Sequence, residues 1–396
     1  MGVELLGLAV ALLIVLGIIE FLVHRRNLSK IPIRIHVSGT RGKSSVTRLI
    51  AAGLRSAGIA TAAKTTGTLA RMILLDGREV PIFRPAGANI SEQIRIVDTS
   101  KELNAQALVI ECMALQPELH WLSEKKFVRA THGVITNVRA DHLDVMGPTE
   151  ADVARCLAGM IPVGGVLITG EKKYLEIFRT AAKDRNTRLV TVGDEDVARI
   201  TDTELVRFSY VEHPENVALA LKVLEEFGIS REVAFKGMWE AIPDPGALTE
   251  HEIDFFGRQL IFVNAFAAND PQSTETIWYA TLKRYPNVQR VIALFNLRAD
   301  RPSRTIQLAR STFWRNTDRV VLMGSGAYLF ARMAAKTGVN PSRLFFAEHQ
   351  RIEEIFETVV GVCSVSNLII GMANIGGQGL DLVQYFKNRE RVRPAA

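Results

Sequence analysis

Cysteine and aromatic residues are scarce in this chain of 396 residues. Its three cysteines, Cys112, Cys156 and Cys363, are odd in number and lack the short spacing of metal ligands. This pattern argues against a disulfide framework and indicates reduced thiols in a cytoplasmic body. Aromatic residues make up only 7% of the chain, and no basic stripe is interleaved with them. The sequence therefore predicts no nucleic-acid partner.

Internal repeats and low-complexity tracts are also missing. Apolar residues make up 47% of the chain and charged residues 23%, which is typical of a globular rather than a disordered protein. The net charge of +6 is mild and owes much to the basic segment 387–393. A chain of this length is long enough for two or three domains.

One long run without charge lies near the N-terminus. Residues 5–19 carry no charge, and residues 21–23 extend the apolar run, so it is long enough to cross a bilayer. Glu4 stands where a secretory signal has a basic leader, and no small-x-small cleavage site follows. Three basic residues come directly after the run: Arg25, Arg26 and Lys30. By the positive-inside rule we predict one membrane anchor at 1–30 and a cytoplasmic body; a buried core helix is the alternative.

A glycine-rich loop follows an apolar-ended run at 31–37 and leads into a helical pattern. Its residues are Gly39, Thr40, Arg41, Gly42, Lys43, Ser44 and Ser45. In such a strand–loop–helix unit the glycines let backbone N–H groups turn toward a phosphate. Lys43 can reach the terminal phosphates, and the Ser44 hydroxyl can bind Mg²⁺. Val37 replaces the first glycine of a generic P-loop, and this compact form resembles ATP-dependent amide ligases of the Mur type. A chance Gly/Ser turn is the alternative.

From residue 31 onward, β-branched apolar runs alternate with helical patterns, which predicts parallel α/β architecture. The expected strands of the first part are 33–37, 107–110, 133–136, 166–169 and 189–192, and its expected helices are 45–57, 91–99, 151–160, 173–184 and 215–227. Proline and glycine accumulate at 242–247, which indicates a domain boundary. Expected strands of the second part are 261–263, 291–294, 320–323 and 368–372. We therefore expect a central domain at 31–245 and a C-terminal domain at 246–396.

Two groups of polar residues follow expected strands. Asp141, His142 and Asp144 come after the strand 133–136, and ligands often bind beyond the carboxyl ends of parallel strands. Glu111 ends the apolar run 107–110, where a carboxylate suits Mg²⁺. By itself, a histidine flanked by acids is more often a surface turn, and Glu111 is equally well interpreted as an ordinary strand-end carboxylate. Together with the glycine-rich loop, these residues indicate a site for a nucleotide and a metal.

The motifs resemble the ATP-binding domain of Mur ligases and folylpolyglutamate synthases, and they occur in the same order. They are Gly39-Thr40-x-Gly42-Lys43-Ser44, Glu111, Thr136-Asn137-x-x-x-Asp141-His142-x-Asp144 and residues 213–220. Pro245-Gly246 resembles the hinge of that superfamily, and residues 268–273 resemble its Ala-His-Asn-Pro segment, with Asn269 in place of histidine. The resemblance implies an α/β fold: a P-loop ATPase domain of Mur-ligase type and a C-terminal Rossmann-like domain, after an N-terminal transmembrane helix.

Within the superfamily, the chain resembles the ligase subunits of poly-γ-glutamate synthases (the PgsB/CapB type). The anchor directly before the loop and five segments carry this resemblance: 64–72, 111–114, 141–149, 235–238 and 264–270. We see no room before the loop for the UDP-sugar-binding domain of Mur ligases, which argues against a peptidoglycan precursor as substrate. Leu157 stands where many Mur-type ligases have a carbamylated lysine, so the number of metal ions stays open.

The resemblance implies ATP-dependent addition of glutamate to a growing poly-γ-glutamate chain through an acyl phosphate, with release of ADP and phosphate. The implied cofactors are ATP and Mg²⁺, and the implied partners are other membrane subunits that export the polymer. A folylpolyglutamate-type ligase is one alternative. A catalytically reduced, ATP-gated membrane scaffold is another, since the lysine at position 157 is missing.

The resemblance also assigns roles to particular residues. The catalytic candidates are Lys43, His142 and Arg301, and the metal candidates are Ser44, Glu111 and His142. The nucleotide candidates are residues 39–45 with Asn137, Asn216 and Asp318; a helix-surface asparagine and a salt-bridged surface arginine are the alternatives for Asn216 and Arg301. For the polyanionic substrate we expect a cationic path of Lys64, Arg71, Arg84 and Arg95, the covering-loop residues Thr66 and Thr68, and Asn269.

Overall fold

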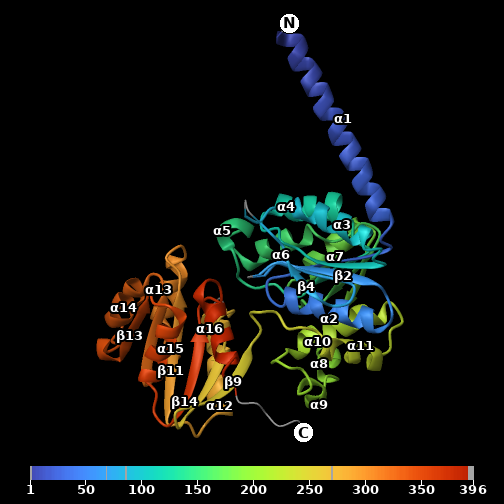
Figure 1. Cartoon of the computed structure of the whole chain (residues 1–396). Helices are drawn as coiled ribbons and strands as arrows, with labels where there is room; N and C mark the ends of the chain where they lie inside the picture. Colours follow the sequence, from blue (N-terminus) through green and yellow to red (C-terminus); the bar gives the residue numbers. More distant parts are fainter. Residues whose placement is uncertain (1, 68, 85–86, 269–270, 391–396) are drawn as a thin grey trace. The chain divides into compact units, whose positions relative to one another are not determined.

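The protein consists of two compact units, Met1–Asp244 and Pro245–Ala396, each built on its own sheet (Figure 1). The computed structural model describes residues 2–67, 69–84, 87–268 and 271–390. The two units are described separately below.

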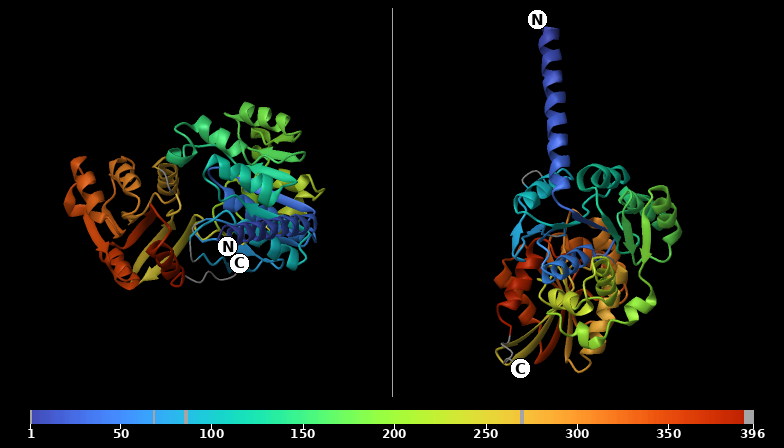
Figure 2. Two further views of the ribbon diagram at one scale, coloured as in Figure 1. Left: turned by 90° about the horizontal axis from the view of Figure 1, so that it is seen from above. Right: turned by 90° about the vertical axis from the view of Figure 1, so that its right-hand side faces the viewer.

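A single long helix, α1 (Gly2–Ser29), projects from unit 1 (Figures 1 and 2). The side chains from Glu4 to Val23 are exposed, and the stretch Glu4–Ser29 is long and apolar enough to cross a membrane. This exposure contradicts the alternative of a buried core helix, because a soluble protein rarely presents so large an apolar surface to water.

An eight-stranded sheet forms the centre of unit 1, in the order β4-β3-β2-β5-β1-β6-β7-β8. Strand β1 (Ile33–Ser38) pairs in parallel with β5 (Ala107–Glu111) on one side and β6 (His132–Ile135) on the other. These strands are apolar almost throughout because both faces of the sheet are covered. The remaining strands are β2 (Thr61–Thr65), β3 (Arg71–Ile73), β4 (Glu79–Pro81), β7 (Val166–Thr169) and β8 (Arg188–Thr191).

The helices of unit 1 pack on both faces of this sheet. They are α2 (Lys43–Ser56), α3 (Glu92–Glu102), α4 (Pro117–Leu122), the π-helix η1 (Ser123–Val128), α5 (Leu143–Met146), α6 (Glu150–Ala158), α7 (Leu175–Asp184), α8 (Asp194–Ala198), α9 (Asp202–Leu205), α10 (Pro214–Glu225) and α11 (Arg231–Trp239). Helix α2 packs against α10 and α11. The approach of α11 is close because Gly237 has no side chain: a Cβ there would lie 2.3 Å from the Ala52 carbonyl oxygen.

Unit 2 is built on a six-stranded sheet in the order β13-β12-β11-β14-β10-β9. Its strands are β9 (Thr249–Phe255), β10 (Arg258–Asn264), β11 (Arg290–Leu297), β12 (Arg319–Gly324), β13 (Leu344–Glu348) and β14 (Ser366–Met372), and its helices are α12 (Pro271–Arg284), α13 (Pro302–Arg310), α14 (Ala327–Lys336), η2 (Pro341–Arg343), α15 (Ile352–Gly361) and α16 (Gln378–Lys387). Apolar clusters lie on both faces of the sheet, one of them around Trp278, Trp314, Phe295 and Phe330. Unit 2 therefore has a core of its own.

The predicted α/β class is confirmed, and every strand expected from the sequence is present. Antiparallel pairs also occur, because β3 and β4 extend the first sheet in antiparallel pairing and β9 pairs antiparallel to β10. Strands β3 and β4 have only three residues each, which is too short for a period of two to stand out in the sequence.

We expect Gly237→Ala to destabilise unit 1, because the added methyl group would push α11 away from α2. Overpacking of this kind costs about 1–3 kcal/mol, which a urea-unfolding curve measures. Gly361→Ala in α15 is the matched control, because nothing lies within 4 Å of a Cβ there. Equal effects of the two substitutions would contradict the close packing of α2 and α11.

Candidate functional site

The glycine-rich loop lies at the centre of the sheet of unit 1. It leaves the carboxyl end of β1 and enters α2, whose first residue is Lys43. The neighbouring strands β5 and β6 end beside it with Glu111 and Ile135. Crevices between such strand ends are the usual ligand sites of doubly wound sheets, and the N-terminus of α2 adds a partial positive charge.

The backbone of the loop is fixed by the segment that follows β6. The Asn137 side chain accepts hydrogen bonds from the Thr40 hydroxyl (2.7 Å) and the Arg41 amide (3.1 Å) and donates one to the Arg41 carbonyl (3.1 Å). Gly39 and Gly42 have φ values of 130° and 81°, which favour glycine. A Cβ on Gly39 would lie 2.0 Å from the Thr136 hydroxyl. Asn137 therefore shapes the loop from within, and its contact with a nucleotide stays a prediction.

The Lys43 ammonium lies across the loop, donating to the carbonyl oxygens of Gly39 (2.7 Å) and Thr40 (3.3 Å). Ser44 and Ser45 continue the first turn of α2, where backbone N–H groups have no partner inside the helix. A flexible lysine over a loop of this shape fits the phosphate groups of a nucleotide.

Glu111 connects the loop to the next strand. Its carboxylate, 2% exposed, accepts hydrogen bonds from the Ser44 hydroxyl (2.9 Å), the Thr66 amide (2.7 Å) and the Thr66 hydroxyl (2.7 Å). A hydroxyl and a carboxylate at this distance, beside the loop, are oxygen donors of the kind that Mg²⁺ takes together with water and phosphate. The donor set therefore fits one divalent cation.

His142 lies on the loop after β6. It has a φ of 46° and its side chain is 42% exposed, with Nε2 3.8 Å from Asp141. Asp141 in turn lies 3.9 Å from the Arg41 guanidinium. These contacts place the Asp141–His142 pair next to the glycine-rich loop.

Asn216, in the first turn of α10, faces the glycine-rich loop. A Cβ on Gly42 would lie 2.5 Å from its side-chain oxygen, and its amide nitrogen donates to Glu212 (2.8 Å). Glu212 is buried and also accepts from the Tyr210 hydroxyl (2.9 Å). The side chain of Asn216 is thus held against the loop, which the alternative of a helix-surface asparagine does not explain.

The four cations expected to form a path for the polyanion differ in their surroundings. Lys64 is fully buried, and its ammonium lies 3.1 Å from Glu92. Burial, which outweighs the attraction of Glu92, lowers the pKa of Lys64. Arg84 makes two hydrogen bonds to the same Glu92, and Arg95 is exposed on α3. Lys64 and Arg84 therefore form an internal ion-pair cluster instead of an open cationic surface, because both pair with the buried carboxylate of Glu92.

Arg71 differs from these residues. It begins β3 directly opposite Thr65. Within the described part of the chain, its buried Nε atom has no hydrogen-bond partner. Of the four cations, Arg71 is the one whose donor is still available beside the Thr66 loop.

Sequence analysis missed Arg48 and Asp244. Arg48, 2% exposed on α2, makes an ion pair with Glu79 of β4 and donates to the Ile242 carbonyl (3.2 Å). Asp244 lies 3.9 Å from Arg48, and a Cβ on Gly67 would lie 3.4 Å from Asp244 and 3.3 Å from the Ser44 hydroxyl. Asp244 thus brings a second carboxylate near Ser44. In the sequence, the proline-rich segment around Asp244 indicated a domain boundary but no site residue.

In unit 2, Arg301 is exposed just before α13, beyond the carboxyl end of β11. Asp318 lies at the other edge of the sheet, where its carboxylate accepts a hydrogen bond from the Val291 amide (2.8 Å) at the start of β11. The eight residues of β11 put about 26 Å between the two edges. Asp318 thus fixes a strand end, and its contact with a nucleotide stays a prediction. Thr68 and Asn269 lie outside the described residues.

Leu157 is 1% exposed on α6 and belongs to the apolar cluster between that helix and the sheet. The position of the family's modified lysine is therefore filled by core packing.

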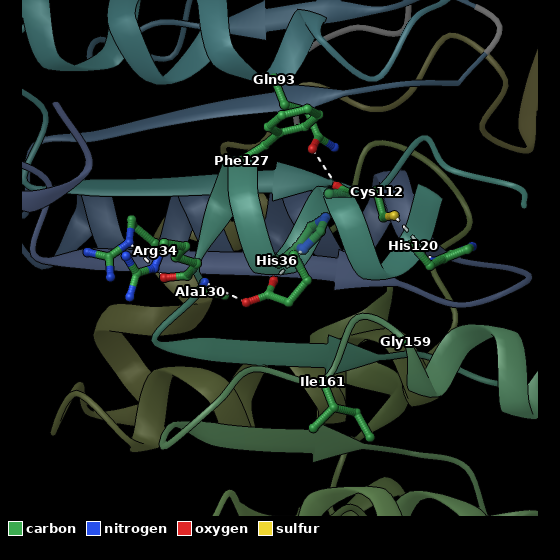
Figure 3. A network of polar contacts seen from close by, with 12 residues as sticks. Arg34, His36, Gln93, Cys112, His120, Phe127, Ala130, Gly159 and Ile161 are labelled. Atoms are coloured by element: carbon green, nitrogen blue, oxygen red, sulfur yellow. Dashed lines mark hydrogen bonds and ion pairs between the residues drawn. The ribbon is translucent and has the colours of Figure 1, made fainter. Parts of the chain in front are cut away.

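A buried polar network connects β1 and the end of β5 to α4 and η1 (Figure 3). His36 of β1 makes an ion pair with Glu124 of η1 (2.8 Å), and Glu124 also accepts from the Ala130 amide (2.8 Å). Cys112, which follows Glu111, lies 3.6 Å from His120. The network fixes η1 and α4 to the strands that carry the glycine-rich loop and Glu111.

The groups of this network shift one another's pKa. Burial alone lowers the pKa of His36, but Cys112 and Glu124 outweigh burial and raise it to about 9. In the same way Cys112 and Cys156 raise the pKa of His120 to about 10. Burial raises the pKa of Cys112, but His120 and His36 outweigh it and hold that pKa well below its usual range.

A glycine-rich phosphate loop, an adjoining acidic strand end and a second α/β unit define a Mur-type ATP-dependent amide ligase. Two family models match: the Mur ligase middle domain at residues 37–233 and the poly-gamma-glutamate synthase CapB C-terminal domain at residues 250–389. The chain belongs to the CapB family of poly-γ-glutamate synthases.

The relatives share most of the chain. The PGA synthase CapB of Bacillus subtilis is 38% identical over 96% of this chain and 96% of its own. The capsule biosynthesis protein CapB of Bacillus anthracis is 38% identical over 96% of this chain and 82% of its own. The folylpolyglutamate synthase/dihydrofolate synthase of Yersinia pestis, complexed with AMPPNP and Mn ion, has a TM-score of 0.66 at 16% identity over 92% of this chain and 91% of that one. At that identity, the last similarity shows the fold alone.

We expect Glu124→Gln to destabilise unit 1 in a pH-dependent way. The folded pKa of His36 is about 9, above the ordinary value of about 6.5. The ion pair between His36 and Glu124 therefore contributes its full stabilisation of the folded state below pH 6.5. That stabilisation is lost as the pH rises through about 9 and His36 loses its proton. At pH 6 the substitution should lower the free energy of unfolding by about 3 kcal/mol, and by pH 10 the loss should shrink. Urea unfolding at both pH values measures this, with the exposed Glu118→Gln as control; equal losses at both would contradict it.

Proposed function

We propose that this protein adds glutamate to a growing poly-γ-glutamate chain at the expense of ATP, releasing ADP and phosphate. The observation that carries the proposal is the Glu111–Ser44–Thr66 cluster beside the glycine-rich loop, in a chain that belongs to the CapB family. ATP binds with its phosphates on residues 39–45 and with Lys43 on the terminal phosphate. Asn216, whose side chain lies against Gly42, contacts the nucleotide beside the glycine-rich loop.

Mg²⁺ is the proposed metal, held by Ser44 and Glu111. When bound, it neutralises charge on the phosphate oxygens. His142 and Asp141, beside Arg41, line the same edge of the site. Asp244 is the further carboxylate near Ser44 that the structure adds to this set.

The reaction has two steps. A carboxylate oxygen of the chain end or substrate attacks the γ-phosphorus, the bond from that phosphorus to the β–γ bridging oxygen breaks, and ADP leaves. The nitrogen of an amine then attacks the carbonyl carbon of the acyl phosphate, the C–O bond to phosphate breaks, phosphate leaves and the amine loses a proton. Lys43 follows the charge on the transferred phosphoryl group, because its ammonium exchanges the two loop carbonyls to which it donates for phosphate oxygens.

Arg71 is proposed to bind a substrate carboxylate, since its buried donor is available beside Thr66. Arg301 is proposed to contact the phosphates when unit 2 closes about Pro245 and Gly246. Closure of this kind protects an acyl phosphate from hydrolysis.

We further propose that α1 anchors the protein in the cell membrane as a single span, with both units in the cytoplasm. Arg25, Arg26 and Lys30 directly after the apolar stretch support this orientation. Polymer made on the cytoplasmic side has to be exported, so the proposal includes other membrane subunits as partners.

A folylpolyglutamate-type ligase remains a second candidate because the fold is shared with such enzymes. It predicts turnover that depends on a pteridine substrate. A scaffold that binds ATP without catalysis is the third candidate. It predicts nucleotide binding without glutamate-dependent turnover.

Lys43→Ala should reduce glutamate-dependent ADP release by about a thousandfold or more, because the charge on the transferred phosphoryl group loses its partner. The measurement uses membranes that contain the full chain and its partners, and it scores ADP against AMP. Lys236→Ala on the exposed face of α11 is the control and should retain activity. AMP as the product would exclude the acyl-phosphate mechanism, and ATP binding without turnover would favour the scaffold.

Glu111→Gln should raise the Mg²⁺ concentration for half-maximal ADP release by about tenfold or more, because the amide has lost the charge that attracts the cation. Glu118→Gln, an exposed change on α4, should leave that concentration unchanged. An unchanged Mg²⁺ dependence in Glu111→Gln would remove Glu111 from the metal site.

A further inference from the structure

The carboxyl-terminal turns of helix α1 pack against the rest of unit 1. His24 is buried and its Nε2 bonds to the Phe127 carbonyl of η1 (2.9 Å), while Asn27 donates to Asp98 of α3 (2.7 Å). Leu28, 3% exposed, lies in the apolar cluster beneath β2 and β5. The last turn of α1 is therefore fixed by side chains on two other elements.

The carboxyl end of α1 is also capped. The Arg34 guanidinium donates to the carbonyl oxygens of Leu28 (3.3 Å), Ile31 (2.6 Å) and Arg129 (2.9 Å). A cation at this end interacts favourably with the helix dipole. One side chain thus joins α1, β1 and the end of η1, and we expect α1 and unit 1 to move as one body.

The apolar stretch ends where this attachment begins. Residues 5–23 span about 28 Å of helix, which matches a hydrocarbon core of about 30 Å. The next residue, His24, already contacts unit 1. With no linker between the span and the fold, the surface around the end of α1 has to lie at the depth of the lipid headgroups.

That surface is basic. The guanidinium of Arg25 and the ammonium of Lys126 lie 5.8 and 6.0 Å from the Phe21 ring centre, so cations from α1 and η1 meet at the end of the apolar stretch. Arg26 and Lys125 are exposed next to them. We call Arg25, Arg26, Lys125 and Lys126 the basic collar.

Two of the acidic side chains near the basic collar are engaged within the protein. Asp98 accepts a hydrogen bond from Asn27, and Glu124 is buried in its ion pair with His36. Glu20 and Glu118 are the exposed exceptions among the neighbouring residues of α1 and α4. The charge that the collar presents outward is therefore positive.

An aromatic side chain lies on the helix that leads into η1. Trp121 is 46% exposed on α4, four residues before Lys125. Helices α3 and α4 lie on the side of unit 1 from which α1 emerges (Figures 1 and 2). Tryptophan is enriched at the headgroup level of membranes, because its ring is apolar and its N–H is polar.

We propose that the basic collar and Trp121 form a second membrane contact, which binds the headgroups of anionic lipids and holds unit 1 flat against the inner leaflet. This inference rests on the proposed membrane anchoring of α1. It gives α4 and η1 a role in lipid binding that is separate from the ligase reaction. Each basic residue close to an anionic surface strengthens such binding about fivefold, and added salt weakens it.

The test is hydrogen–deuterium exchange of the full chain in nanodiscs of phosphatidylcholine alone and of phosphatidylcholine with phosphatidylglycerol. We expect exchange in residues 117–130 to slow by about tenfold in the anionic discs. The charge reversal Lys125→Glu/Lys126→Glu should abolish this difference. Lys183→Glu/Lys236→Glu is the matched control, because it makes the same charge change on exposed sites of α7 and α11 and should keep the difference. Unchanged protection of residues 107–111 verifies that each variant is folded.

The two proposals fail in different ways. If residues 5–23 exchange freely in both discs, α1 does not span the membrane and the anchoring proposal fails. If they are protected but residues 117–130 exchange equally in both discs, only the lipid contact is overturned. Protection that requires copurified subunits of the synthase would assign this face to a protein partner and likewise overturn it.

Discussion

The buried carboxylate of Glu111 is the constraint on which the site depends. A buried anion is costly unless its oxygens are hydrogen-bonded, and here Ser44 and the amide and hydroxyl of Thr66 supply three bonds. These bonds connect the first turn of α2, the end of β5 and the loop after β2. Movement of the first turn of α2 or of the loop after β2 would take hydrogen bonds away from the carboxylate, so the glycine-rich loop, Glu111 and the Thr66 loop are coupled.

The same strand end couples the site to the side of unit 1 from which α1 emerges. Glu111 faces Ser44, whereas the next residue, Cys112, lies beside His120 in the network of α4. His36, two residues before the end of β1, makes an ion pair with η1. Polar groups thus connect the nucleotide loop, through the sheet, to the helices that contact the end of α1. The ionisable groups of this network, such as His36 and Glu124, are buried in an otherwise apolar interior and are paired with one another there.

Sequence analysis predicted the strands and helices of both units well because their apolar periods are long and regular. It also found the glycine-rich loop and Glu111, whose signals are local. It missed β2, β9 and β13, and also β3 and β4, which are too short to show a period. It missed Arg48 and Asp244 as well. These two residues look ordinary in the sequence, and their pairing depends on chain segments almost 200 residues apart. The residue roles assigned from the family resemblance remain proposals.

The sequence by itself determined the α/β class, the apolar N-terminal stretch and the phosphate loop, because each depends on residue types at short and fixed spacing. Only the tertiary structure decided which side chains of the site meet. Ser44 and Glu111 are 67 residues apart, and Lys64 looks like an accessible cation until the fold buries it against Glu92. It also placed Asp318 at the opposite end of β11 from Arg301. Burial and long-range contacts depend on which strands are neighbours in a sheet. The spacing of residues along the chain does not give that order.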